Sequence, residues 1–228
     1  MVPFPNDPMN AFDRRHIVVN LEMLPLCSPN IRSGKPTERA QLVGQKLNDL
    51  CHNLIDPSNL YSSSDLSHSN GQIVSWYLYA DMYCFDHDGN IQDCAVLALV
   101  SALKSTLLPP ITVTPAGEAV ISSEIVDRSI AIQLTHMPIL TTFGIINEHI
   151  LADPNLEEEG IVSGTLTIAY DERGNLCALD CVGGSTITDE QTKECMKLAK
   201  GRVVSVSSYI DNTVENYFKK LKEAFEPQ

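Results

Sequence analysis

"YLYADMYCFDHDGNIQDCAVLALVSALKST" (residues 77–106) decides the fold of this 228-residue chain. An apolar strand over residues 72–85 leads directly into the acidic turn DHDG (residues 86–89). An apolar helix follows at about residues 91–105 and is ended by two prolines. This succession is typical of α/β proteins, because the N-terminus of such a helix presents unpaired backbone N–H groups to an anion. The turn is therefore either a working phosphate site or only the scaffold of one.

The residues before this stretch predict a further strand and a further helix. Residues 17–24 (IVVNLEML) are typical of a strand, and a turn-rich stretch follows it. Apolar residues spaced three and four apart predict an amphipathic helix over residues 37–55. They are Ala40, Val43, Leu47, Leu50 and Leu54. Residues 1–15 contain three prolines and no periodicity, which predicts an irregular arm.

The residues after this stretch predict a β-rich segment and one long helix. Several short strands are expected over residues 111–152, and residues 163–180 are typical of a hairpin that turns at residues 173–175. Thr188 and Gln191 form a candidate capping box, and a stripe of apolar residues spaced three or four apart continues to Phe225. This helix of about 35 residues is expected to lie across most of the domain.

Composition limits the partners and the cellular compartment. The formal net charge of −13, from 16 Lys and Arg against 29 Asp and Glu, repels a polyanion at long range, so any contact with nucleic acid must be local or shared with a basic partner. Seven cysteines without a C-x-x-C pair predict reduced core thiols in a cytosolic or nuclear protein. The sequence has neither a signal-peptide pattern nor an apolar run long enough for a membrane span, which predicts a soluble intracellular chain.

Few motifs carry chemistry. The alternation of acidic residues in the turn DHDGN begins like a calcium loop, but position 12 is Leu97 instead of Glu, so a strand-to-helix turn is the favoured interpretation. The acidic run at residues 157–159 is interpreted as the start of a short helix instead of a catalytic pair. The signatures of nucleotide loops, hydrolase elbows and metal-binding histidine pairs do not occur. Arg32, Lys35 and Arg39 form a small basic group that is a candidate for phosphate or RNA contact.

Four blocks, in this order and spacing, resemble the RNase PH family, and most closely one of its eukaryotic exosome ring subunits. They are "VNLEMLPLCSPNIRSGKP", "WYLYADMYCFDHDGNIQDCAVLALVSAL", "LTHMPILTTFGIINEHILADPNLEEE" and "SGTLTIAYDERGNL". The resemblance implies an α/β (α+β) fold of two βαβα halves with a long C-terminal helix. The expected division is an arm (residues 1–15) and one domain (residues 16–228), whose halves are residues 16–108 and 109–228. The family's first strands have no counterpart here, so we expect an uncovered edge or apolar face.

The resemblance also implies where catalysis would occur. Active members hold the attacking phosphate with a D-G-G-T-R-T turn, whereas here Asn90, Ile91, Gln92 and Asp93 follow the glycine. Isoleucine cannot donate a hydrogen bond, glutamine carries no charge, and Asp93 is expected to repel phosphate. The family's leaving-group acid falls on Gly164, counted from the acidic run. In the family's G-R-x-x-E turn, Lys35 replaces a bidentate arginine.

The resemblance therefore implies a non-catalytic structural subunit of the RNA exosome core ring, with no catalytic residues, cofactor or metal. The implied partners are other RNase PH-like ring subunits, RNA-binding cap subunits and RNA in the assembled channel, without a membrane. The implied location is the nucleus, including the nucleolus, and the cytoplasm. One alternative is an active phosphate-dependent 3′-to-5′ exoribonuclease with a site shared between subunits. Another, a free regulatory RNA-binding protein, conflicts with the net charge.

Overall fold

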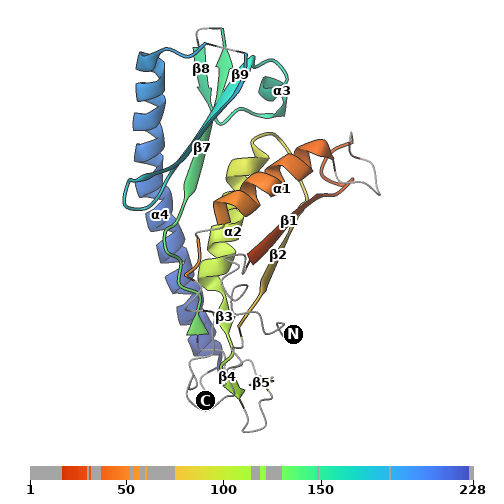
Figure 1. Ribbon diagram of the computed structural model, residues 1–228, viewed down its shortest axis with the longest axis vertical. Coiled ribbons are helices and arrows are strands. Elements are labelled where there is room, and N and C mark those ends of the chain that lie inside the picture. Colours follow the sequence, from red (N-terminus) through yellow and green to blue (C-terminus); the bar gives the residue numbers. More distant parts are fainter. Residues whose placement is uncertain are drawn as a thin grey trace, which may run out of the picture.

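A computed structural model describes residues 17–29, 31, 37–51, 54–56, 60, 75–113, 119–121, 130–147, 149–184 and 186–225. The expected arm (residues 1–15) lies outside these residues. The elements form an elongated molecule with one helix along its side (Figure 1).

The first half has the order β-α-β-α that the resemblance implies. Strands β1 (Ile17–Met23) and β2 (Leu78–Cys84) pair in parallel, and helices α1 (Glu38–Cys51) and α2 (Ile91–Ser105) follow them. A parallel pair requires a crossover, and α1 lies within the crossover here. Helix α2 has the boundaries that the sequence predicts.

Two boundaries in the first half differ from the prediction. Strand β2 begins at Leu78, whereas residues 72–74 of the predicted strand lie outside the described residues. Helix α1 ends at Cys51 instead of residue 55, because Ile55 leaves the helix and forms an antiparallel bridge with Leu134. A tertiary contact therefore overrides the apolar periodicity at this end of the helix.

The outer face of the β1–β2 pair is exposed. Side chains of β2 alternate between a half-buried and an exposed face, as a strand with one covered side requires. Tyr79 and Tyr83 on the exposed face are 70% and 51% accessible. Within the described residues the sheet has two strands. The resemblance implies such an uncovered face.

The second half is built from antiparallel hairpins. Strands β7 (Ile139–Ile146), β8 (His149–Ala152), β9 (Gly164–Tyr170) and β10 (Leu176–Gly183) form a sheet in the order β10-β9-β7-β8. A single helical turn, α3 (Leu156–Glu159), lies between β8 and β9. The order in this half is ββαββα, so a hairpin stands in place of each single strand of the βαβα pattern.

Two short strand pairs lie between α2 and β7 in the chain. Strand β3 (Leu107–Leu108) pairs with β6 (Ile130–Ala131), and β4 (Ile111–Val113) pairs with β5 (Ala119–Ile121). Strands β4, β5 and β6, together with β7 and β8, fall within residues 111–152, where the sequence predicts short strands.

The β9–β10 hairpin turns where the sequence predicts. One oxygen of Asp171 accepts hydrogen bonds from the backbone N–H groups of Arg173 (3.0 Å) and Asn175 (2.7 Å), and the other accepts one from the Asn175 side chain (2.8 Å). Burial acts to raise the pKa of Asp171, but these bonds outweigh it and hold the pKa below its usual value of 3.8. Gly174 supplies the positive φ of the turn.

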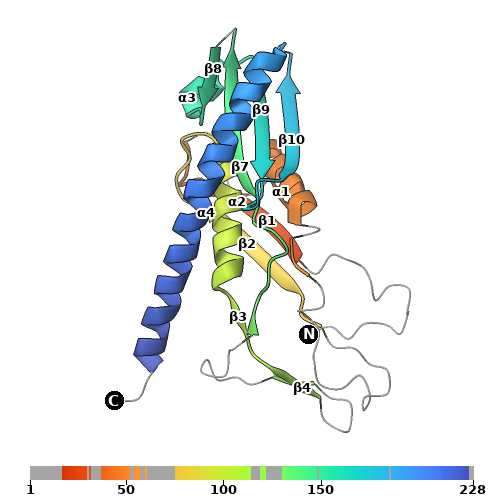
Figure 2. The same ribbon diagram turned by 90° about the vertical axis from the view of Figure 1, so that its left-hand side faces the viewer.

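The last helix, α4 (Asp189–Phe225), is 37 residues long and begins with the predicted capping box. The Gln191 backbone N–H donates to the Thr188 hydroxyl, and the Thr188 N–H donates to the Gln191 side chain. Helix α4 packs on β7, β9 and α2, so it contacts both halves (Figure 2). No helix in the described part of the chain has the length and apolar content that crossing a bilayer requires.

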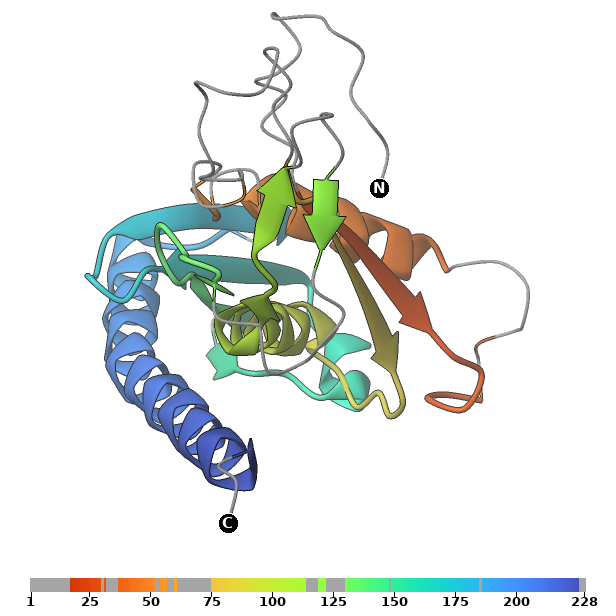
Figure 3. The same cartoon turned by 90° about the horizontal axis from the view of Figure 1, so that it is seen from below.

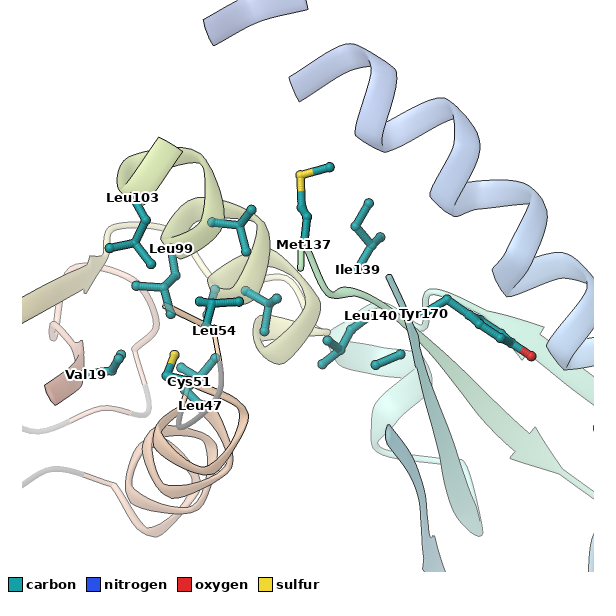
Figure 4. Packing of buried hydrophobic residues seen from close by; sticks show 14 of the residues in the cluster. Val19, Leu47, Cys51, Leu54, Leu99, Leu103, Met137, Ile139, Leu140 and Tyr170 are labelled. Carbon is teal, nitrogen blue, oxygen red and sulfur yellow. The ribbon is translucent and has the colours of Figure 1, made fainter. Parts of the chain in front are cut away.

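One continuous core joins the halves. Helix α2 lies between α4 and the β1–β2 pair (Figure 3). Its side chains Leu99 and Leu103 belong to the same cluster as Leu47 of α1 and Ile139 of β7 (Figure 4). Apolar burial contributes roughly 25 cal/mol per Å², so this shared cluster is the main source of cohesion between the halves.

The cysteines are free, but only some are core residues. Cys27, Cys51 and Cys195 are buried, and burial raises the pKa of Cys51 to about 12. Cys94, Cys177 and Cys181 are exposed, which corrects the prediction of core thiols throughout. Two of these lie on β10, an edge strand that α4 does not cover, and the third lies on the outer side of α2.

Candidate functional site

The turn between β2 and α2 packs closely on the loop that precedes α3. Gly89 has a φ of +96° and forms an antiparallel bridge with Asn155, and the Leu156 N–H donates to the Asp88 carbonyl at 3.1 Å. A Cβ on Gly89 would lie 2.5 Å from the Asn155 carbonyl carbon and 2.6 Å from the Pro154 oxygen. The glycine is required both by its φ and by this contact between two backbones.

Helix α3 gives the acidic run a fixed position. Asn155 and Glu158 form a reciprocal capping box with two bonds of 2.8 Å. The acidic run is therefore the first turn of a short helix, as the sequence predicts, and Glu159 is its last residue.

The Glu159 carboxylate reaches back to the turn before α2. One of its oxygens accepts a hydrogen bond from the Asn90 backbone N–H at 3.0 Å. The Nη2 atom of Arg39, near the start of α1, lies 2.5 Å from both Glu159 oxygens. The Glu159 side chain is 13% exposed and the Arg39 side chain 44%. A carboxylate of the chain itself thus accepts the hydrogen bonds that Arg39 and the Asn90 N–H donate at this turn.

His87 adds no positive charge to this arrangement near neutral pH. Burial and the adjacent Arg39 guanidinium lower the pKa of His87 from its usual value of 6.5, and they outweigh the raising effect of Glu159, Asp88 and Asp86. Of the described groups that contact the Glu159 carboxylate, Arg39 carries the positive charge.

Asp93 lies in the protein interior, which corrects the expectation that it would repel phosphate directly. Its side chain is 3% exposed and accepts bonds from the Thr142 N–H (2.9 Å), the Thr142 hydroxyl (2.7 Å) and the Asn90 amide (3.0 Å). Arg202 of α4 forms an ion pair with it at 3.3 Å. Because this charge is paired and hydrogen-bonded, Asp93 connects α2, β7 and α4 and does not face an incoming anion.

Asn90 immediately precedes α2, but its side chain does not act as the usual helix cap. It adopts a left-handed conformation (φ 40°), and its side chain accepts no bond from the helix. Its amide instead donates to Asp93 and, at 2.6 Å, to Asp153. The strand-to-helix turn is present as predicted, and the Asn90 side chain connects two carboxylates instead of capping the helix.

The other predicted positions that the structure describes bring no charged group to this turn. Ile91 is buried, and Gln92 is half-buried. Gly164 begins β9, and neither it nor the next residue, Thr165, has a carboxyl group. Arg32 and Lys35 lie outside the described residues, so only Arg39 of the basic group is placed.

Sequence reasoning missed the two ion pairs that organise this region. Arg39 and Glu159 are 120 residues apart, and Asp93 and Arg202 are 109 residues apart. A local pattern carries no signal for such contacts. Among the described residues, no group of three or more His, Cys, Asp or Glu side chains could hold a metal ion.

The order of strands and helices is that of a 3′ exoribonuclease scaffold. Profiles of the 3′ exoribonuclease family match the chain twice, with domain 1 at residues 2–109 and domain 2 at residues 136–202. The chain belongs to this family, the RNase PH family.

Curated relatives are named as exosome components. The chain is 32% identical over 212 residues to exosome complex component Rrp42 of Methanothermobacter thermautotrophicus, which covers 93% of this chain and 73% of the relative. It is 32% identical over 200 residues to exosome complex component rrp43 of Schizosaccharomyces pombe, with coverage of 88% and 70%. Exosome complex component RRP45 of Bos taurus is 30% identical over 90% of this chain, which spans 46% of that relative. The resemblance inferred from the four blocks is confirmed.

Solved structures agree. The Archaeoglobus fulgidus exosome with RNA bound to the active site superposes with a TM-score of 0.61 at 25% identity, over 85% of this chain and 70% of that one. An archaeal exosome core superposes with a TM-score of 0.63 at 22% identity, over 92% and 72%, and supports the fold.

Proposed function

We propose that this chain is a non-catalytic structural subunit of an RNA exosome core ring, which supports 3′-to-5′ RNA processing and degradation carried out by partner subunits. The observation that carries the proposal is the turn before α2, where the Glu159 carboxylate is bound by Arg39 and the Asn90 N–H. An anion that approaches this turn would compete with Glu159 for these donors. The assembly is inferred from similar proteins that are named as exosome complex components.

The residues around the turn support the non-catalytic role. Ile91 offers no hydrogen bond and is buried, and Gln92 brings no charge. Gly164, the position counted for the leaving-group acid, has no proton to transfer. Loss of one preorganised electrostatic donor typically lowers turnover about 100- to 1,000-fold, and here several groups are replaced together.

The proposed partners are other RNase PH-like ring subunits, RNA-binding cap subunits and RNA that passes through the assembled channel. Arg32, Lys35 and Arg39 are the candidate RNA contacts. The proposed locations are the nucleus, including the nucleolus, and the cytoplasm. Because the net charge is −13, RNA contact is expected to depend on the assembly instead of on this chain alone.

The alternative function is an active phosphate-dependent 3′-to-5′ exoribonuclease. It has one specific support, the similar Archaeoglobus fulgidus exosome, which was solved with RNA bound to its active site. In that case a neighbouring subunit would complete a composite site with this chain.

Assembly can be tested by size-exclusion chromatography of the native complex from its own cells, followed by cross-linking and mass spectrometry. We expect the chain to elute with a large assembly and to cross-link to RNase PH-like neighbours. Elution near its own mass of 25.1 kDa would contradict a ring subunit and would favour a free adaptor.

A further inference from the structure

The Glu159 carboxylate is coordinated as a bound anion would be. Nη2 of Arg39 lies 2.5 Å from both of its oxygens, and the Asn90 N–H donates to one of them. Guanidinium groups and backbone N–H groups bind carboxylates and phosphates in the same way. The Arg39 guanidinium and the Asn90 N–H therefore form an anion-binding arrangement, and Glu159 of the same chain is bound in it.

We propose that Glu159 masks Arg39 from phosphate groups, so that RNA or inorganic phosphate binds at Arg39 only when this carboxylate is displaced. This inference rests on the proposed function and deepens it, because it names the carboxylate that keeps phosphate groups away from this turn.

The position of the masking carboxylate is fixed by its surroundings. The capping box holds α3, and the Gly89–Asn155 bridge holds α3 against the turn. A tethered group has a high effective concentration, often in the millimolar range or above, so a free anion competes poorly with it. Glu159 therefore masks Arg39 more effectively than a mobile surface carboxylate would.

Arg39 remains accessible enough to be a ligand once unmasked. Its side chain is 44% exposed, whereas that of Glu159 is 13% exposed. The masking group thus lies on the inner side of the guanidinium, and the outer side faces solvent. Removal of the Glu159 charge leaves a half-exposed cation beside the Asn90 N–H, which is the arrangement that a phosphate group requires.

The test uses the full chain with Glu159→Gln, which keeps the side-chain size and removes the charge. Phosphorus-31 NMR titration with inorganic phosphate and fluorescence anisotropy with a short single-stranded RNA, both at fixed ionic strength, distinguish the two sources of phosphate. We expect affinity for one or both to rise on the order of 10-fold, the value of one charge-assisted hydrogen bond. For RNA, the slope of log affinity against log salt should steepen by about 0.7, as for one additional phosphate contact.

Glu157→Gln is the matched control, because Glu157 lies on the same short helix, is exposed and makes none of these contacts. It should leave both affinities unchanged, and Arg39→Ala combined with Glu159→Gln should abolish the gain. Glu159→Asp keeps the charge but shortens the side chain by one methylene, so it should give a smaller gain of the same kind even if Glu159→Gln folds poorly.

Two results would overturn the proposal. One is a folded Glu159→Gln protein that binds phosphate and RNA no better than Glu157→Gln. The other is saturable phosphate binding by the unmodified chain that Arg39→Ala removes. Neither readout involves RNA cleavage, so failure here is distinct from failure of the non-catalytic assignment.

Discussion

Asp93→Ala is expected to lower the free energy of unfolding by about 2–4 kcal/mol, because it removes a buried carboxylate that accepts several hydrogen bonds and one partner of a partly buried ion pair. The carboxylate is 3% exposed and accepts bonds from Thr142, Asn90 and Arg202. Its loss leaves the Thr142 N–H without its acceptor and Arg202 without its counter-ion. Because these donors belong to β7, the turn and α4, the damage extends to the junction between both halves.

Urea denaturation followed by circular dichroism measures this effect. Asp49→Ala is the control, because Asp49 is exposed on α1, and its substitution is expected to change stability by no more than about 0.5 kcal/mol. A loss below about 1 kcal/mol for Asp93→Ala would show that the buried network contributes little, since typical point mutations already cost that much.

Gly89→Ala is expected to lower stability by roughly 3 kcal/mol, because a strained backbone conformation costs about 1–3 kcal/mol before any steric clash is counted. The new Cβ would lie 2.5 Å from the Asn155 backbone at a φ of +96°. The loop that carries α3 must then move away from the turn, and Glu159 should lose its contact with the Asn90 N–H.

Gly201→Ala in α4 is the matched substitution. Its Cβ meets nothing within 4 Å, and alanine in a helix is favoured over glycine by about 0.5–1 kcal/mol. Thermal melts should therefore move in opposite directions for the two variants. A Gly89→Ala protein as stable as the unmodified chain would contradict the close approach of the two backbones.

Local signals in the sequence predict the elements well. The prolines after Ser105, the Thr188–Gln191 capping box and the turn at Gly174 depend on residues within a few positions of each other. Their geometry is determined by short-range hydrogen bonds and sterics, so one sequence is sufficient to predict them.

The candidate site is predicted less well because its chemistry depends on distant residues. An aspartate in the first turn of a helix ordinarily faces solvent and interacts with the helix dipole, which is why Asp93 was expected to face an anion. Its burial depends on Arg202, and the position of Glu159 depends on Arg39. Neither partner can be found from spacing along the chain. The exposed Cys177 and Cys181 similarly depend on which strand forms the sheet edge.

We propose that this chain keeps the scaffold of a 3′ exoribonuclease without its reaction. Release of nucleoside diphosphates from a single-stranded RNA, measured with and without inorganic phosphate in a ring assembled from purified subunits, tests it most directly. We expect Asp88→Ala and Gln92→Ala in this chain to leave any phosphate-dependent release unchanged, and the chain alone to release none. Release by the chain alone, or loss of release from the ring in either variant, would contradict the claim.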